Sequence, residues 1–264
     1  MKILVCIKQV PGSSNVEVDP VSGVLKRSGV PSKCNPYDLY AIEAALSLAE
    51  RFGGSVECLT MGPPQAKAVI QEAICMGASG GTVLSDRKFA GADVLATAYT
   101  LSQGVRQCGE FDLIICGKQT TDGDTAQVGP QIAEKLEIPQ VSYVADIEKD
   151  GDTLTVRRML EDGYMTVQVQ TPCLLTCIKE LNTPRYMTIR GILDCDAEPV
   201  TVLDYNALKD DPLIEVDTIG LKGSPTNIYK SFTPPRKGSG MMLEGSGRET
   251  VERLFGILSA KHII

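Results

Sequence analysis

The chain has 264 residues, 43% of them hydrophobic, and carries a net charge of −7 with a sequence pI near 4.9. This length and composition suit one large domain with an appendage and exclude a disordered chain. The acidic balance argues against nucleic-acid binding, and no apolar run approaches the roughly 18 residues of a membrane span. Because Met1-Lys2 leads directly into a strand-like run rather than a signal peptide, we expect a cytoplasmic protein without membrane insertion.

The nine cysteines lie mostly in apolar, strand-like runs, and His262 is the only histidine. Reduced, buried thiols are the usual state of cysteines placed in this way in a cytosolic chain. Cys173 and Cys177 lack the Cys-x-x-Cys spacing of a zinc ligand pair. The sequence therefore predicts no metal site.

The first half of the chain alternates strand-like and helix-like segments. Apolar runs predict strands at residues 2–8, 56–61, 80–84 and 113–116, and apolar residues at helical spacing predict helices at 39–52, 65–76, 94–108 and 125–136. A β-hairpin is expected at residues 16–25, where apolar and polar residues alternate. The order strand, helix, strand, helix predicts an α/β fold with a doubly wound, parallel, Rossmann-like sheet.

Ligands of such folds bind at the carboxyl edge of the sheet, where four loops should gather. The four are the loop after Lys8, residues 35–38, the loop after Met61 and residues 121–130. Asn35 is expected as the N-cap of the first helix, with Pro36 at the first helical position.

The most informative stretch is the polar loop after the apolar run 113–116. Its sequence, Gly117-Lys-Gln-Thr-Thr-Asp-Gly-Asp-Thr-Ala-Gln-Val-Gly129, leads into the helix predicted from residue 125, with Asp124 or Thr125 as N-cap. A strand, a loop of small residues and a helix N-terminus together present backbone N–H groups to a phosphate. The loop has neither the Walker pattern nor the spaced glycines of a dinucleotide fingerprint.

Two other interpretations of this loop stay open at this point. It also has the composition of a simple capped turn. Asp122-Gly-Asp-Thr125 moreover fits the Asp-x-Asp-Thr pattern of aspartyl-phosphate phosphatases, in which the first Asp attacks a phosphoryl group. In those enzymes that Asp directly follows the strand, whereas five residues separate Cys116 from Asp122 here, which disfavours this chemistry.

Past residue 139 the pattern changes to β-structure. Strands are predicted at residues 144–147, 153–159, 165–169 and 173–177, with a turn at Asp150-Gly151. An exposed connection begins at residues 182–186. Between Asp194 and Asp217 there are eight acids and one base, which indicates a solvated segment or a surface for a basic partner.

The sequence suggests a nucleotide-binding domain at residues 1–194 and a C-terminal arm at 195–264. The arm ends in an amphipathic helix predicted at 248–260. Because the arm lacks a core of its own, it should lie on the domain or on a partner subunit.

Motifs in a fixed order run along the whole chain. They are Ile3-Leu-Val-Cys-Ile-Lys-Gln-Val10, Asn35-Pro-Tyr-Asp38, Met61-Gly-Pro63, the segment from Gly117 to Gly129, Val156-Arg-Arg-Met-Leu-Glu-Asp-Gly163, Thr171-Pro-Cys-Leu-Leu-Thr176 and Pro184-Arg-Tyr186. With these motifs the sequence resembles the β (small) subunit of electron transfer flavoproteins. The resemblance implies a heterodimer in which the α (large) subunit carries one FAD and the β subunit holds an adenine nucleotide. It also implies that the C-terminal helix packs on the α subunit.

That family has two kinds of β subunit. In one, the nucleotide is a structural AMP. In the other, the electron-bifurcating kind, it is a second FAD that takes a hydride from NADH. One electron then goes to ferredoxin or flavodoxin and the other, through the α-subunit FAD, to an acyl-CoA or 2-hydroxy-acid dehydrogenase. The segments Asp86-Arg-Lys-Phe-Ala-Gly-Ala-Asp93, Asp122 to Pro130 and Gly223-Ser-Pro-Thr226 resemble the bifurcating kind, and the AMP-holding electron carrier is the alternative.

The resemblance also implies which residues contact the nucleotide. Around the adenosine they are Cys6, Asn35, Pro36, Tyr37, Asp38 and Met61. Around the pyrophosphate they are Thr125, Ala126, Gln127, Val128 and Gly129, and at the flavin end they are Asp93, Thr97 and Ser224. Gly117, Asp122, Gly123 and Asp124 are also expected to contact the nucleotide. The simpler interpretations are an ordinary N-cap for Asp93 and core packing for Cys6 and Met61.

No catalytic side chain is expected, because the redox chemistry belongs to the flavin. The resemblance places a partner-binding loop after Pro184-Arg-Tyr, with Tyr186 and Ile189 as apolar contacts, although an exposed Ile is usually plain surface. A stand-alone nucleotide-binding or stress-type domain also fits the α/β pattern, but it leaves the C-terminal arm unexplained.

Overall fold

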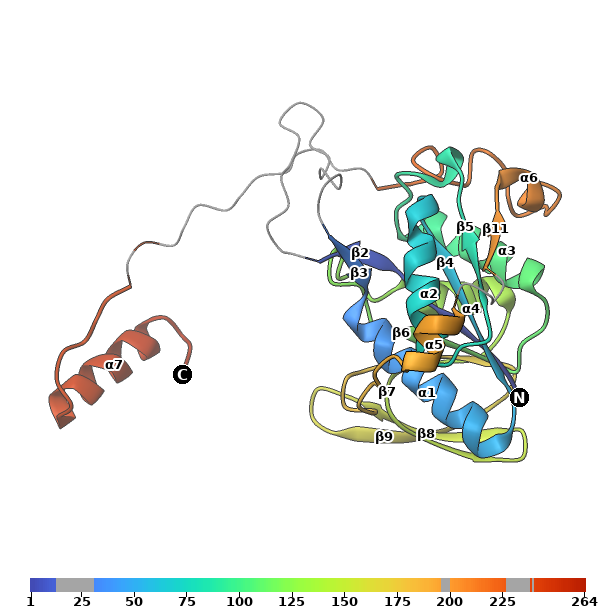
Figure 1. The fold of residues 1–264 in the computed structure, drawn as a ribbon. Helices are drawn as coiled ribbons and strands as arrows, with labels where there is room; N and C mark the ends of the chain where they lie inside the picture. Colours follow the sequence, from blue (N-terminus) through green and yellow to red (C-terminus); the bar gives the residue numbers. More distant parts are fainter. Residues whose placement is uncertain (13–30, 196–199, 227–237, 239) are drawn as a thin grey trace. The chain divides into compact units, whose positions relative to one another are not determined.

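The protein, seen in a computed structural model, is described at residues 1–12, 31–195, 200–226, 238 and 240–264 (Figure 1). It divides into two compact units, Met1–Tyr229 and Lys230–Ile264. The hairpin predicted at 16–25 lies outside the described residues. Among those residues, no helix is both long and apolar enough to cross a membrane.

Nine strands of the described chain form one sheet in the order β11-β5-β4-β1-β6-β10-β7-β8-β9. Their bounds are β1 (Lys2–Cys6), β4 (Ser55–Met61), β5 (Gly81–Leu84), β6 (Leu113–Gly117), β7 (Gln140–Asp150), β8 (Thr153–Met159), β9 (Tyr164–Gln170), β10 (Cys173–Cys177) and β11 (Val200–Leu203). The strands from β11 to β7 pair in parallel, and β7, β8 and β9 pair antiparallel. The predicted α/β sheet is thus confirmed. A separate antiparallel pair joins β2 (Gln9–Pro11) to β3 (Ser32–Cys34).

Helices cover both faces of this sheet (Figure 1). The four large ones are α1 (Pro36–Phe52), α2 (Lys67–Met76), α3 (Val94–Cys108) and α4 (Val128–Leu136). The helices α1 and α2 pack on one face, where Ile42 and Ile70 are fully buried. On the other face α3 and α4 contribute Ala98 and Ile132, also fully buried. Parallel strands buried on both faces must be apolar throughout, which is why the sequence predicted them.

The chain reverses its winding at β1. It moves outward from β1 through β4 to β5, then returns to the other side of β1 to form β6. In open α/β sheets the crevice between the loops at such a reversal is where ligands bind. The loops that follow β1 and β6 therefore flank the expected ligand site.

The start of α4 differs from the sequence prediction. The helix begins at Val128 rather than Thr125, Gln127 occupies the N-cap position, and no side chain caps it. The predicted caps Asp124 and Thr125 are therefore wrong. Asp124 and Ala126 have φ of 51° and 56°, a left-handed conformation that an α-helix cannot include.

The chain beyond residue 194 also joins the first unit, so this unit extends past the boundary that composition indicates. The short strand β11 pairs with β5, and α6 (Tyr205–Leu208) follows it. Leu208, Ile214 and Ile219 are buried in the core on the α3 side. Several acids of this stretch also make local contacts; Asp204, for example, accepts a hydrogen bond from Ala207 N at 3.1 Å and so caps α6.

The second unit contains the predicted terminal helix, α7 (Arg248–Ala260). None of its residues is buried, and Val251 and Phe255 are each more than half exposed. Within its described residues this unit therefore has an amphipathic helix with an uncovered apolar face.

Candidate functional site

Three of the four predicted loops are joined by side chains at the winding reversal, and we call residues 8, 35–38 and 117–129 the loop cluster. Lys8, at the end of the first apolar run, donates from Nζ to both carboxylate oxygens of Asp122 at 2.9 and 3.0 Å. The Asp122 side chain is only 11% exposed, so this ion pair is partly shielded from water. It ties the loop after β1 to the loop after β6.

Asn35 forms a second tie within the loop cluster. It stands at the predicted N-cap position of α1, but its side chain makes no capping hydrogen bond. Instead, Nδ2 donates to Gln119 O at 2.9 Å and Oδ1 accepts from Thr121 N at 3.1 Å. The fully buried Asn35 therefore fixes the course of the β6 loop over the start of α1.

Asp38 lies in the first turn of α1, beneath these contacts, and is almost fully buried. Its carboxylate accepts from Lys8 N at 2.7 Å and from Asn35 Nδ2 at 2.9 Å. Burial raises the pKa of the Asp38 carboxyl to about 7, although these hydrogen bonds and the charge of Lys8 oppose the rise. The carboxylate thus holds the end of β1 against α1.

The end of β6 touches α1 so closely that only glycine fits at position 117. A Cβ there would lie 2.3 Å from Asp38 Oδ1 and 2.7 Å from the carbonyl carbon of Tyr37. Pro36 and Tyr37 form the first positions of α1 and are half-buried beside this contact. Gly117 therefore sets the distance between two parts of the loop cluster.

The loop before α4 has the backbone form of an anion site. Ala126 is left-handed, with φ 56°, and Gln127 that follows is right-handed, with φ −118° and ψ −20°. Such an alternation turns successive N–H groups toward one side and forms an anion-binding concavity. The first turn of α4 follows directly, and first-turn amides of a helix lack partners within it. Backbone donors at residues 126–129 thus fit a pyrophosphate.

The side chains of this loop leave room for a ligand. Gly123, Asp124, Thr125 and Gln127 are exposed, while Val128 is half-buried. Gly129 is buried, and a Cβ there would lie 2.9 Å from Thr176 Cγ2, so the start of α4 packs tightly on β10.

A second cluster forms around Asp93, before α3, at the same carboxyl edge of the sheet. Asp93 caps α3 by accepting from Ala96 N at 3.1 Å, as predicted for an N-cap. Its other oxygen accepts from Thr226 Oγ1 at 2.7 Å, and Asp93 N donates to Ser224 Oγ at 2.8 Å. Partial burial raises the pKa of Asp93, but these hydrogen bonds outweigh it and hold the pKa below its usual value. Thr97 lies one turn further along α3 and is half-buried.

Two of the expected adenosine contacts belong to the core. Cys6 is buried at the end of β1, where it pairs in register with Cys116 of β6. Met61 ends β4 and packs partly buried against the core on the α3 side. Their side chains serve packing, which leaves the backbone for any ligand contact.

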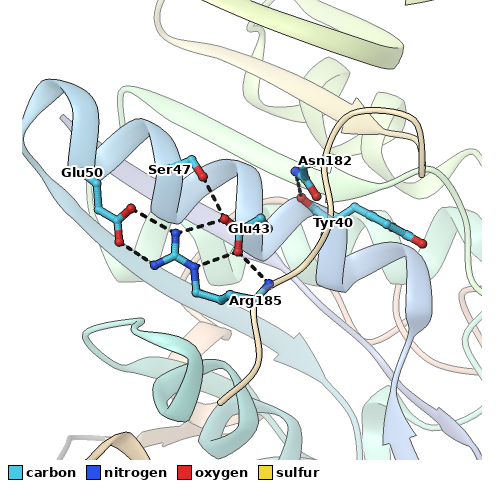
Figure 2. Close-up of polar contacts among 6 residues, drawn as sticks. All are labelled: Tyr40, Glu43, Ser47, Glu50, Asn182 and Arg185. Carbon is cyan, nitrogen blue, oxygen red and sulfur yellow. Dashed lines mark hydrogen bonds and ion pairs between the residues drawn. The ribbon is translucent and has the colours of Figure 1, made fainter. Parts of the chain in front are cut away.

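The expected partner-binding residues lie elsewhere, on the face covered by α1 and α2. Tyr186 is 94% exposed and Ile189 is 80% exposed. The chain before them is held on α1 by Asn182 and Arg185, as Figure 2 shows. The structure does not bring these two residues together with the loop cluster.

Sequence reasoning missed Lys8, Gln119 and Thr226 as individual contributors. Lys8 and Thr226 stand inside stretches that the sequence did single out. Their partners, Asp122 and Asp93, lie 114 and 133 positions away along the chain, so only the folded arrangement of the loops pairs them.

Known proteins are similar in sequence to this chain along its whole length. Residues 22–208 match the family model described as the electron transfer flavoprotein domain. The chain is 55% identical over 268 residues to the acryloyl-CoA reductase electron transfer subunit gamma of Anaerotignum propionicum, with 100% of both chains covered. It is 47% identical to the caffeyl-CoA reductase-Etf complex subunit CarD of Acetobacterium woodii and to the electron transfer flavoprotein subunit beta of Thermoanaerobacterium thermosaccharolyticum, again over 100% of each chain.

Proposed function

The chain belongs to the electron transfer flavoprotein family as a β (small) subunit, and we propose that it binds FAD at the loop cluster and takes part in electron bifurcation from NADH. The observation that carries this proposal is the anion-binding backbone at residues 126–129, set at the winding reversal and braced by Lys8 and Asn35. Backbone donors in this setting favour a phosphate-bearing ligand.

The cluster around Asp93 favours FAD over AMP. An AMP ends at its single phosphate, whereas the flavin half of FAD continues beyond the pyrophosphate. Asp93 and Thr97 lie half-buried at the same edge of the sheet, so they offer polar groups for that extra half. Asp93 is fixed by hydrogen bonds to Thr226 and to Ser224, and the Ser224 hydroxyl is buried between Asp93 N and Gly220 O. When bound, FAD supplies the redox chemistry, accepting a hydride from NADH and releasing electrons singly. This chain's residues hold and orient it.

The partners follow from the family and from the relatives. We propose that the chain pairs with an electron transfer flavoprotein α subunit and delivers one electron to ferredoxin or flavodoxin and the other to a flavin-dependent dehydrogenase. Two relatives bear names that include an acyl-CoA reductase, acryloyl-CoA and caffeyl-CoA reductase. These names favour an acyl-CoA enzyme over a 2-hydroxy-acid dehydrogenase as the downstream partner.

Two surfaces suit these partners. We propose that the unit Lys230–Ile264 packs on the α subunit through the uncovered apolar face of α7. Residues 186–194, here called the docking segment, expose Tyr186 and Ile189 and would contact the dehydrogenase. Large apolar side chains exposed together are typical of an interface.

The proposal is tested by following both electron acceptors at once. The purified heterodimer is mixed anaerobically with NADH, ferredoxin and an acyl-CoA dehydrogenase with its oxidised substrate. Bifurcation requires that ferredoxin is reduced only while the dehydrogenase is turning over, with equal numbers of electrons to each. If the dehydrogenase is reduced while ferredoxin stays oxidised, the chain does not bifurcate electrons and acts as a simple carrier, which contradicts the proposal.

A further inference from the structure

The docking segment is not held in place by buried side chains. It contains α5 (Ile189–Asp194), and no residue of this helix is buried. Leu193 is 77% exposed, so the apolar side chains of the segment point to solvent rather than to the core. Hydrophobic burial, the usual source of positional stability, therefore contributes little here.

Arg185, the residue just before the segment, binds two carboxylates with its guanidinium group, an arrangement that we call the fork. Arg185 donates from Nε to Glu43 Oε2 at 2.8 Å and from Nη2 to Glu43 Oε1 at 3.0 Å. It also bonds both carboxylate oxygens of Glu50, two turns further on the same face of α1 (Figure 2). The backbone N–H of Arg185 donates to Glu43 Oε2 at 3.0 Å, so both main chain and side chain are fixed. Bidentate arginine–carboxylate pairs fix the orientation of the two side chains as well as the distance between them.

This cluster differs from an ordinary surface ion pair. Glu43 is only 8% exposed, and its Oε1 also accepts from Ser47 Oγ at 2.9 Å. Burial raises the pKa of Glu43, but the hydrogen bonds and charge of Arg185 outweigh it and leave the pKa below its usual value. A buried carboxylate without its arginine is strongly disfavoured, so the structure commits Arg185 to this position.

Among the described residues, few other contacts hold the segment, and Cys195, just after it, packs partly buried against the core. Asn182 Nδ2 donates to Tyr40 O at 2.9 Å, and Thr188 N donates to Cys75 O at 3.0 Å. Gly191 rests on the same carbonyl, because a Cβ there would lie 2.5 Å from Cys75 O. Between these points and the end of α2 lies a hollow of about 370 Å³ whose lining includes Arg185. The segment thus spans a hollow and is held at a few hydrogen-bonded positions.

We propose that Arg185 is a positioning residue for partner docking. Its fork with Glu43 and Glu50 holds the docking segment in the orientation that presents Tyr186, Ile189 and Leu193 to the dehydrogenase. This inference rests on the proposed function, in which the docking segment meets that partner. A segment already ordered before binding loses less conformational entropy on association, and this difference appears in affinity.

The test uses the whole heterodimer and three variants. Arg185→Gln removes the fork, Arg185→Lys keeps the charge but cannot form bidentate pairs with two carboxylates, and Arg51→Gln makes the same charge change at an exposed position on α1. The readouts are the half-saturating dehydrogenase concentration, the maximal rate and hydrogen exchange along residues 186–194.

Arg185→Gln should raise the half-saturating concentration about 10-fold, which corresponds to about 1.4 kcal/mol, and leave the maximal rate unchanged. Exchange should speed up across the docking segment and not in the loop cluster. Arg185→Lys should fall between Arg185→Gln and the wild type, and Arg51→Gln should match the wild type. An effect of Arg51→Gln as large as that of Arg185→Gln would refute positioning in favour of a general charge effect.

A milder variant covers the case in which Arg185→Gln fails to fold. Glu50 is exposed at its carboxylate, so Glu50→Gln loosens the fork without leaving Glu43 unpaired, and it should weaken docking about 2- to 3-fold. Ile189→Glu distinguishes a failure of the positioning role of Arg185 from a failure of the docking surface itself. If Ile189→Glu weakens docking while the Arg185 and Glu50 variants do not, the positioning inference is wrong and the docking surface stands. If none of the three weakens docking, the docking surface itself is wrong.

Discussion

The contact between Gly117 and α1 offers a sharp test of how the loop cluster is built. In Gly117→Ala the new Cβ would lie 2.3 Å from Asp38 Oδ1, 2.7 Å from Tyr37 C and 2.9 Å from Asp38 N. Two of these atoms are backbone in the first turn of a helix and cannot rotate away. Favourable contacts need about 3.5 Å, so β6 and α1 must separate by roughly 1 Å.

The cost can be worked out from these contacts. Overpacking of this kind costs roughly 1–3 kcal/mol, and displacing Asp38 from its hydrogen bond to Lys8 N adds about 1 kcal/mol. A total of about 3 kcal/mol should lower the melting temperature by roughly 6–12 °C in a unit of this size. The separation also moves the loop cluster, so the heterodimer should lose adenine nucleotide from this chain.

The assay is thermal unfolding of the heterodimer with FAD in excess, alongside nucleotide content after desalting. Gly163→Ala is the matched control, since nothing lies within 4 Å of a Cβ at that position. The control should stay within about 0.5 kcal/mol of the wild type. An unchanged melting temperature and full nucleotide content in Gly117→Ala would show that this contact does not set the geometry of the loop cluster.

Three further variants test separate parts of the account. Burial raises the pKa of Asp38 from 3.8 to about 7, so between these values the folded chain keeps a proton that the unfolded chain releases. The contribution of Asp38 to the free energy of unfolding should therefore fall by on the order of 4 kcal/mol from pH 4 to 7, and chemical denaturation should show this fall as the difference between the pH profiles of the wild type and Asp38→Asn. Asp93→Ala removes the N-cap of α3 and the hydrogen bond to Thr226, so hydrogen exchange should become faster at residues 220–226 and FAD retention should drop. Unchanged exchange would contradict the role of Asp93 in holding residues 220–226. Ile189→Glu should weaken dehydrogenase binding by roughly 30-fold, about 2 kcal/mol, with both flavins retained; loss of flavin instead would mean that the docking segment is structural.

The main elements of the fold could be predicted from the sequence because their physical causes are local. Strands such as β1 and β6 are buried on both faces and read as apolar runs, and Gly53 ends α1 with φ 71° where two glycines stand together. The strand β11 escaped prediction because it is short, partly exposed and set among acidic residues. Its place in the sheet comes from pairing with β5, which is more than a hundred positions away.

The candidate site could be located but not assembled from the sequence. The loop before α4 was recognised by its small residues, yet nothing in the side chains of Asp124 and Ala126 signals their left-handed backbone. The start of α4 was therefore misplaced. Contacts such as Arg185 to Glu43 join residues 142 positions apart, and charge patterning along the chain cannot pair them. Side chains that act between distant loops are visible only after folding.

The central claim is that this chain holds FAD at the loop before α4, and counting released nucleotide tests it most directly. The heterodimer is denatured and its FAD and AMP are quantified, in parallel with two variants. Ala126→Val places a β-branched residue at φ 56° inside the loop, and Glu137→Val imposes the same strain at φ 57° at the far end of α4. We expect two FAD per heterodimer in the wild type and in Glu137→Val, and one in Ala126→Val. One FAD and one AMP in the wild type, with no second FAD taken up on soaking, would contradict the claim.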